Sequence, residues 1–155
     1  MHTARLRIRK FQAEDLDDLY DLLSDEDVMK YLEAPYTREA AKVFLHRCGL
    51  AEAPLIYAVE DCSGTFAGYV IYHPYDAASY EIGWVLRKSQ WGKGYAGELT
   101  RCLVEDARNR TDNLVIACLP AQTATGQIAR KNGFSFVGNI DGLDIYRLPL
   151  KQKQP

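Results

Sequence analysis

Two glycines with a lysine between them, Gly92-Lys93-Gly94, form the most informative segment for chemistry in this sequence. An apolar run that ends at Leu86 precedes them, and an amphipathic stretch follows, which indicates a strand, a loop and a helix. Glycine lets the backbone approach an anion closely, and the first turn of a helix offers unpaired N–H groups and a positive dipole end. Lys93 adds a positive charge. These residues predict a site for a phosphate-bearing ligand.

The segment Gly92-Lys93-Gly94-Tyr95-Ala96-Gly97 also fits the Gly-x-Gly-x-x-Gly pattern of dinucleotide-binding loops, with Asp112 about 20 residues further on. In that pattern the first glycine follows its strand directly, whereas residues 87–91 intervene here. Asp112 also precedes the next predicted strand instead of ending it, so its carboxylate would not reach a ribose. We therefore reject a nicotinamide dinucleotide as the ligand.

The elements that must position this loop alternate between strand and helix patterns. Strands are predicted at residues 6–11, 55–60, 65–73, 80–86, 113–119, 134–138 and 143–148, and helices at 16–23, 27–32, after the N-cap Thr37, after Gly94 and before Gly133. Pro74 is expected to end its strand, and Asp141-Gly142 to form a hairpin turn. We expect one mixed α/β domain over residues 1–150, with a mainly antiparallel sheet of about seven strands flanked by helices, and a polar tail at 151–155.

Composition narrows the function classes. The chain has 155 residues and a formal net charge of −2, which argues against a general electrostatic grip on nucleic acid. It lacks the ~20 consecutive apolar residues that span a bilayer, and its first residues do not resemble a signal peptide. Its four cysteines show no Cys-x-x-Cys pair and no histidine at ligand spacing, so we expect free thiols and no metal site. The sequence predicts a soluble cytoplasmic protein, as a monomer or a homodimer.

Several segments resemble a known family. Ile82-Gly83-Trp84-Val85-Leu86, followed by Trp91-Gly92-Lys93-Gly94-Tyr95-Ala96, is similar to motif A of the GNAT N-acetyltransferase superfamily. Residues 5–9 and 28–32 resemble its ribosomal-protein N-terminal acetyltransferase branch, and residues 124–134 resemble the next motif of the family. The likeness covers nearly the whole chain in the family's element order. It implies the GNAT fold and acetyl-CoA as the co-substrate, with no metal.

The resemblance also implies which residues bind the cofactor. The main chain of Trp84, Val85 and Leu86 would pair with the pantetheine arm, while the amides from Gly92 to Gly97 would hold the pyrophosphate. The implied cofactor-binding residues are Trp84, Val85, Leu86, Gly92, Lys93, Gly94, Tyr95, Ala96, Gly97 and Gln122. The strands that hold Val85 and Cys118 would splay apart, with the thioester in the gap.

Aminolysis of a thioester needs a neutral amine, a polarised carbonyl and a proton for the leaving thiolate. Glu81, on the strand that would meet the cofactor, is our first choice as general base, with His73 as a weaker rival. The alternative for Glu81 is a solvated or salt-bridged side chain. The amide of Leu86 or a neighbour would polarise the carbonyl. Thr125, which matches the family's serine, would protonate the thiolate; its alternative is helix capping.

Other residues have weaker claims on the site. Cys118 suggests a covalent acyl-enzyme, but a cysteine in a buried strand is usually a small apolar filler. Tyr31 and Tyr36 would line an acceptor pocket if the helices near them form the acceptor side, although most aromatic residues pack in a core. The role of the two tyrosines follows only from the resemblance.

Two functions remain open from the sequence. The first is an acetyl-CoA-dependent N-acetyltransferase that acts on a primary amine, either a small amine or a protein N-terminus. The second is an acyl-CoA-binding sensor or interaction module of the same fold. The second arises because Gln122 stands where the family has Asn, and because no tyrosine lies near Ile128 and Ala129.

Overall fold

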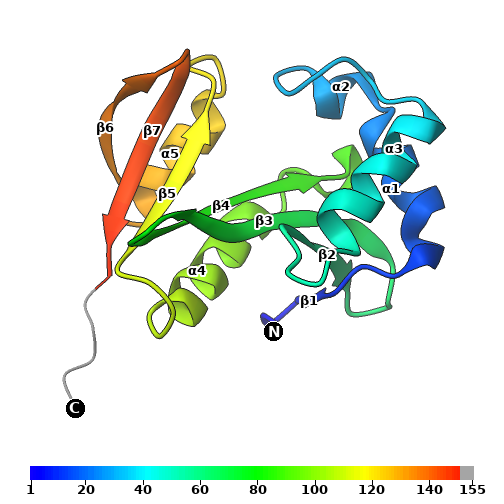
Figure 1. The fold of residues 1–155 in the computed structure, drawn as a ribbon, viewed down its shortest axis with the longest axis horizontal. Helices are drawn as coiled ribbons and strands as arrows, with labels where there is room; N and C mark the ends of the chain where they lie inside the picture. Colours follow the sequence, from blue (N-terminus) through cyan, green and yellow to red (C-terminus); the bar gives the residue numbers. More distant parts are fainter. Residues whose placement is uncertain (151–155) are drawn as a thin grey trace. The chain divides into compact units, whose positions relative to one another are not determined.

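The computed structural model describes residues 1–150, and the predicted tail at 151–155 lies outside the described residues. The strands are β1 (Leu6–Arg9), β2 (Ile56–Asp61), β3 (Phe66–Asp76), β4 (Ser79–Leu86), β5 (Asn113–Cys118), β6 (Ser135–Ile140) and β7 (Leu143–Pro149). The helices are α1 (Leu16–Leu23), α2 (Glu26–Met29), α3 (Arg38–Phe44), α4 (Tyr95–Ala107) and α5 (Thr123–Lys131), with the short turns η1 (Ala13–Asp15), η2 (Leu45–Gly49) and η3 (Lys88–Gln90) (Figure 1).

The seven strands belong to one mixed sheet, in the order β1-β2-β3-β4-β5-β7-β6. The pairs β1–β2, β2–β3, β5–β7 and β6–β7 are antiparallel. β4 and β5 are parallel and pair from Ser79↔Asn113 to Glu81↔Val115, a ladder shorter than either strand. The predicted fold class, a mainly antiparallel sheet of seven strands with flanking helices, is confirmed.

The chain forms two compact units, Met1–Ile71 with Trp84–Tyr95, and Tyr72–Gly83 with Ala96–Pro155. That residues 1–150 act as one domain therefore stays a prediction. In the first unit, α1 and α3 lie side by side (Figure 1). The buried core of this unit consists of Phe11, Leu19, Leu22, Leu23, Met29, Ala41, Leu45, Ile56, Ala58, Phe66, Tyr69 and Val85. Thr37 caps α3 as predicted, because its hydroxyl accepts a hydrogen bond from Ala40 N at 3.1 Å.

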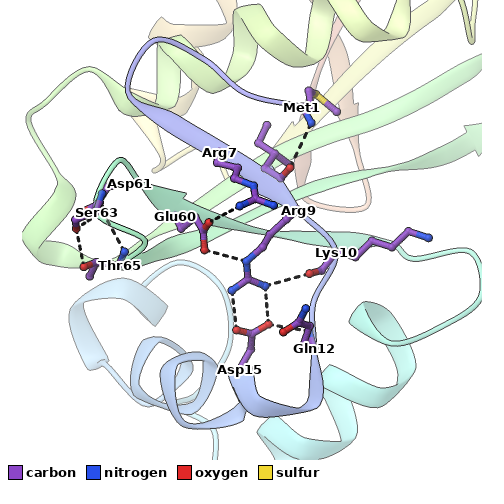
Figure 2. Close-up of polar contacts among 11 residues, drawn as sticks. Met1, Arg7, Arg9, Lys10, Gln12, Asp15, Glu60, Asp61, Ser63 and Thr65 are labelled. Carbon is purple, nitrogen blue, oxygen red and sulfur yellow. Dashed lines mark hydrogen bonds and ion pairs between the residues drawn. The ribbon is translucent and has the colours of Figure 1, made fainter.

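A half-buried guanidinium ties the beginning of the first unit together. Arg9 donates to both carboxylate oxygens of Asp15, at 2.8 and 2.9 Å, and its Nε donates to Glu60 at 2.9 Å (Figure 2). The main-chain N–H of Gln12 also donates to the Asp15 carboxylate, at 2.7 Å. Burial raises the pKa of the Asp15 carboxyl, but the hydrogen bonds from Arg9 and Gln12 outweigh it and hold that pKa below its ordinary value. β1, η1 and β2 are thereby joined through one side chain.

The second unit buries one face of α4 and almost all of β5. Leu99, Leu103 and Ala107 are fully buried on α4, four residues apart along one face as the sequence predicts. β6 lies along β7, and their turn at Asp141-Gly142 has φ values of 53° and 87°, as the predicted two-residue hairpin requires (Figure 1).

Two predicted element ends are wrong by three residues. β3 does not stop at Pro74 but continues to Asp76, because proline's fixed φ suits an extended chain and its missing N–H costs little at this exposed end of the strand. α2 ends at Met29 instead of reaching Leu32. Leu32 is 43% exposed, so burial gives no reason to extend the helix.

Among residues 1–150, no helix is long and apolar enough to cross a membrane. In the same residues no group of three or more His, Cys, Asp and Glu side chains is placed to hold a metal ion. The cysteines Cys48, Cys62, Cys102 and Cys118 are free thiols.

Candidate active site

The loop between β4 and α4 has the geometry of an anion-binding turn. Gly92 and Gly94 take left-handed backbone conformations, with φ of 75° and 81°, and α4 begins at Tyr95. A Cβ on Gly92 would meet no heavy atom within 4 Å, so this side of the loop is open. The first N–H groups of α4 have no acceptor within the helix, so an anion there gains hydrogen bonds and a favourable dipole. Lys93 lies exposed between the two glycines.

Side chains of the loop itself hold its shape. The indole Nε1 of Trp91 donates to the main-chain oxygen of Leu86 at 3.0 Å, which closes the loop onto the end of β4. The ammonium of Lys93 donates to the side-chain oxygen of Gln90 at 3.1 Å. The Trp91 side chain therefore stabilises the turn.

Ion pairs join the start of the loop to the first helices. Arg87 Nη2 lies 2.7 Å from Asp18 on α1, and Lys88 Nζ lies 2.6 Å from Asp27 on α2. The Arg87 guanidinium also lies over the ring of Phe66, at 5.3 Å. These contacts connect the position of the loop to that of α1 and α2.

The main chain at the end of β4 has a fixed orientation. Val85 O approaches Gly68 on β3 so closely that a Cβ there would lie 2.1 Å from it, and Arg87 N donates to Ala67 O at 2.9 Å. The Val85 carbonyl therefore faces β3. A planar trans peptide points its C=O and N–H in opposite directions, so the N–H of Leu86 faces the other edge of β4. That amide or a neighbouring one is expected to polarise a thioester carbonyl.

Glu81 forms an ion pair with His73 in the second unit. His73 Nε2 lies 2.9 Å from the Glu81 carboxylate, and Nδ1 lies 2.8 Å from the main-chain oxygen of Pro74. A carbonyl oxygen only accepts, so Nδ1 carries a proton and a second proton on Nε2 suits the carboxylate. The hydrogen bond to Glu81 accordingly raises the pKa of His73 above 6.5. The two candidate bases are thus a pair that shares a proton.

The start of α5 places the other two candidates. Gln122 is the N-cap residue, and its side-chain oxygen accepts a hydrogen bond from Leu119 N at 2.8 Å. Thr125 is half-buried and lies within the first turn of the helix, so it is not the capping residue. The next residue, Gly126, has no room for a side chain, because a Cβ there would lie 2.6 Å from the Tyr146 hydroxyl.

The environments of the weaker candidates, Cys118, Tyr36 and Tyr31, differ in burial and contacts. Burial raises the pKa of the Cys118 thiol, so it is a poor nucleophile at neutral pH, in agreement with an apolar filler. Tyr36 donates to Glu33 at 2.9 Å and packs edge-on against Phe44, and burial raises the pKa of Tyr36 to about 12. Tyr31 is 38% exposed.

The predicted residues fall into both units. The first unit contains Trp84, Val85, Leu86, Gly92, Lys93, Gly94 and Tyr95, and the second contains Glu81, Ala96, Gly97, Gln122 and Thr125. The structure brings the loop glycines and Lys93 together at the start of α4, and it brings Glu81 onto His73.

Comparison with known proteins identifies the family of this chain. The family described as "Acetyltransferase (GNAT) domain" matches residues 5–135. The chain belongs to the GNAT acetyltransferase family. It is 31% identical over 138 residues to the uncharacterized N-acetyltransferase YnaD of Bacillus subtilis (strain 168), a match that covers 84% of this chain and 79% of YnaD.

Solved GNAT structures agree with the fold. An acetyltransferase (GNAT family) from Bacillus anthracis superposes with a TM-score of 0.87 and 25% identity, covering 96% of this chain and 97% of that one. The spermidine N-acetyltransferase of Vibrio cholerae, in complex with CoA and spermine, has a TM-score of 0.77 at 19% identity, with 95% of each chain covered. This GNAT protein is an acetyltransferase, and the open glycine loop with Lys93 suits the phosphates of acetyl-CoA.

Two contacts of this GNAT chain were not apparent from its sequence. Arg5 donates to the main-chain oxygen of Lys93, 88 residues later. His73 is the partner of Glu81 rather than only its rival. The first contact leaves no local signal, whereas the second joins residues only eight apart in the sequence.

Proposed function

We propose that this GNAT acetyltransferase transfers the acetyl group of acetyl-CoA directly to a primary amine. The observation that carries the proposal is the open loop with left-handed Gly92 and Gly94 immediately before α4. The amides of residues 92–97 would hold the pyrophosphate, and the main chain of residues 84–86 would pair with the pantetheine arm. When bound, acetyl-CoA supplies the activated acetyl thioester.

The N–H of Leu86 is the proposed donor to the thioester oxygen. Val85 O faces β3, which turns this N–H to the opposite edge of β4. A main-chain donor fixed before the substrate arrives needs no reorganisation during the reaction, and losing one such donor typically costs about 10² to 10³ in rate. No metal is required for this polarisation.

The His73–Glu81 pair is the proposed proton acceptor for the amine. While His73 is protonated, its Nε2 proton occupies the Glu81 carboxylate. Once His73 loses that proton, the pair can accept one from the amine, so the rate should rise with pH through the raised pKa of His73. Glu81 would act directly or through a water chain.

Two residues of the second unit complete the proposal. Thr125 is free of the capping role and would deliver the proton to the leaving thiolate. Gln122 would contact the pantetheine arm through its amide nitrogen, since its oxygen is engaged by Leu119 N. Both roles are carried over from the family resemblance.

The acceptor is proposed at the level of a primary amine. The segments at 5–9 and 28–32 resemble the branch that acetylates protein N-termini. The Vibrio cholerae relative is a spermidine N-acetyltransferase whose structure holds spermine. Peptide α-amines and polyamines are therefore the two classes to be compared.

The test is amine-dependent release of coenzyme A thiol from acetyl-CoA. Spermidine and a peptide with a free α-amine are the acceptors, and the same peptide with an acetylated N-terminus is the matched control. We expect release with one of the amines above the control rate, and formation of the N-acetyl product by mass spectrometry. Tight acetyl-CoA binding with no release for any amine would contradict the enzyme and favour the sensor instead.

A further inference from the structure

Arg5 is held at the bend of a short turn at the N-terminus. Thr3 N donates to Leu6 O at 2.8 Å, and Leu6 N donates back to the Thr3 hydroxyl at 3.0 Å. His2 forms a β-bridge with Arg7, which closes the turn. The side chain of Arg5 therefore starts from a fixed piece of backbone.

From this turn the guanidinium reaches the glycine loop, within the same unit. Arg5 Nη2 donates to the main-chain oxygen of Lys93 at 2.8 Å, and its Cζ lies 4.6 Å from the ring centroid of Tyr95. A planar guanidinium stacks on an aromatic face while its edge donates a hydrogen bond, and a lysine ammonium does not combine the two. Arg5 thus holds the loop on both sides of Gly94.

The bond to Lys93 sets the direction of the peptide between Lys93 and Gly94. No cis peptide occurs in residues 1–150, and a planar trans peptide points its C=O and N–H in opposite directions. Because the Lys93 oxygen faces Arg5, the N–H of Gly94 points away from Arg5. Glycine crosses between positive and negative φ at little cost, so this peptide has other orientations when nothing anchors it.

We propose that Arg5 is a positioning residue for acetyl-CoA, which holds the Lys93 carbonyl so that the Gly94 amide stays directed at the pyrophosphate. The inference rests on the proposed function. Arg5 acts through the loop rather than on a phosphate, so its effect is the same for any ligand that carries this pyrophosphate.

Calorimetric titration with coenzyme A tests the role of Arg5. Arg5→Ala is compared with Arg7→Ala, a matched control because the Arg7 guanidinium, two residues on, is 66% exposed and pairs with Glu60. We expect the Kd for coenzyme A to rise about tenfold in Arg5→Ala, the loss of one charge-assisted hydrogen bond. In Arg7→Ala it should stay within about twofold. Equal Kd values for wild type and Arg5→Ala would overturn the proposal.

A second ligand separates positioning from direct contact. 3′-Dephospho-coenzyme A keeps the pyrophosphate and lacks the 3′-phosphate, so Arg5→Ala should weaken both ligands by the same factor. A loss confined to coenzyme A would place Arg5 on the 3′-phosphate and overturn the proposal. Arg5→Lys, which keeps the charge, should also weaken both ligands, and wild-type affinity in that variant would count equally against it.

Failure of this inference is distinguishable from failure of the proposed function. If wild-type protein binds neither ligand, the cofactor itself is wrong and the inference falls with it. If wild type binds and the Arg5 variants bind as well, only the inference fails. Thermal unfolding without ligand establishes that the variants are folded, and we expect this because Arg5 is exposed.

Discussion

At the scale of single residues, the proposed chemistry centres on Glu81 and its contact with His73. Glu81→Gln keeps the size and a hydrogen bond to the imidazole but removes the proton acceptor. We expect kcat to fall about 10²-fold or more, with the Kd for acetyl-CoA unchanged, because Glu81 is not among the proposed cofactor-binding residues. Steady-state kinetics and calorimetry measure the two quantities. An unchanged kcat would remove Glu81 from the mechanism without removing the enzyme.

The same contact makes stability depend on pH. Its hydrogen bond to Glu81 raises the pKa of His73 above the ordinary 6.5, so the folded protein keeps a proton that the unfolded chain releases above that pH. The stability from this pair is complete below pH 6.5 and is lost as the pH rises through the folded pKa. Urea unfolding from about pH 6 to about pH 9 should show this decline in wild type and a flatter profile in His73→Gln. The same decline in both proteins would exclude His73 as its source.

At the scale of elements, the Arg9 guanidinium connects β1, η1 and β2 (Figure 2). Asp15→Asn removes the charge that pairs with Arg9 at a largely buried position, and we expect the free energy of unfolding to fall by about 2 kcal/mol. Asp17→Asn is the matched control, because its carboxylate is 82% exposed and should contribute less than about 0.5 kcal/mol. Denaturant unfolding measures both. Equal losses would show that the Asp15 contact adds nothing special.

Acid should remove the contribution of Asp15. The pKa of this carboxyl lies below its ordinary 3.8, because the hydrogen bonds from Arg9 and Gln12 outweigh the effect of burial. A lowered pKa stabilises the fold above the ordinary value, and the effect is lost as the pH falls through the folded pKa. The stability gap between wild type and Asp15→Asn should therefore narrow below about pH 4. A constant gap would contradict this assignment.

The approach of β3 to β4 depends on Gly68. Its φ is 148°, and a Cβ there would lie 2.1 Å from Val85 O. Gly68→Ala should destabilise the protein by more than about 3 kcal/mol, because backbone atoms must move. Gly64→Ala is the control for φ alone, since Gly64 has φ of 81° with open space around it, and should cost about 1 kcal/mol. Similar losses in the two variants would show that the close contact is unimportant.

Features that depend on a few neighbouring residues were predictable from the sequence. The N-cap at Thr37, the turn at Asp141-Gly142 and the glycine loop each depend on local backbone chemistry, and the structure shows all three. The continuation of β3 past Pro74 was not predictable, because a proline is excluded only where the neighbouring strand needs its N–H as a hydrogen-bond donor. The contact of Arg5 with Lys93 joins residues 88 apart, and no local pattern indicates it.

At the scale of the whole molecule, the proposal requires that acetyl-CoA binds the folded chain. A ligand that binds only the folded state stabilises it by about 2.7 kcal/mol at a concentration a hundredfold above its Kd. The proposal assigns that binding to the glycine loop, so substituting Gly94, with φ of 81°, by Ala should abolish most of the stabilisation. Retained stabilisation in Gly94→Ala would place the cofactor elsewhere.

The most direct measurement is thermal unfolding of wild-type protein with acetyl-CoA, coenzyme A and NAD in parallel. We predict a clear rise in Tm with acetyl-CoA and coenzyme A and none with NAD. In a dinucleotide site the first glycine follows its strand directly, whereas here residues 87–91 separate the end of β4 from Gly92. A rise with NAD alone, or no rise with any of the three, would contradict acetyl-CoA as the co-substrate and with it the proposed acetyl transfer.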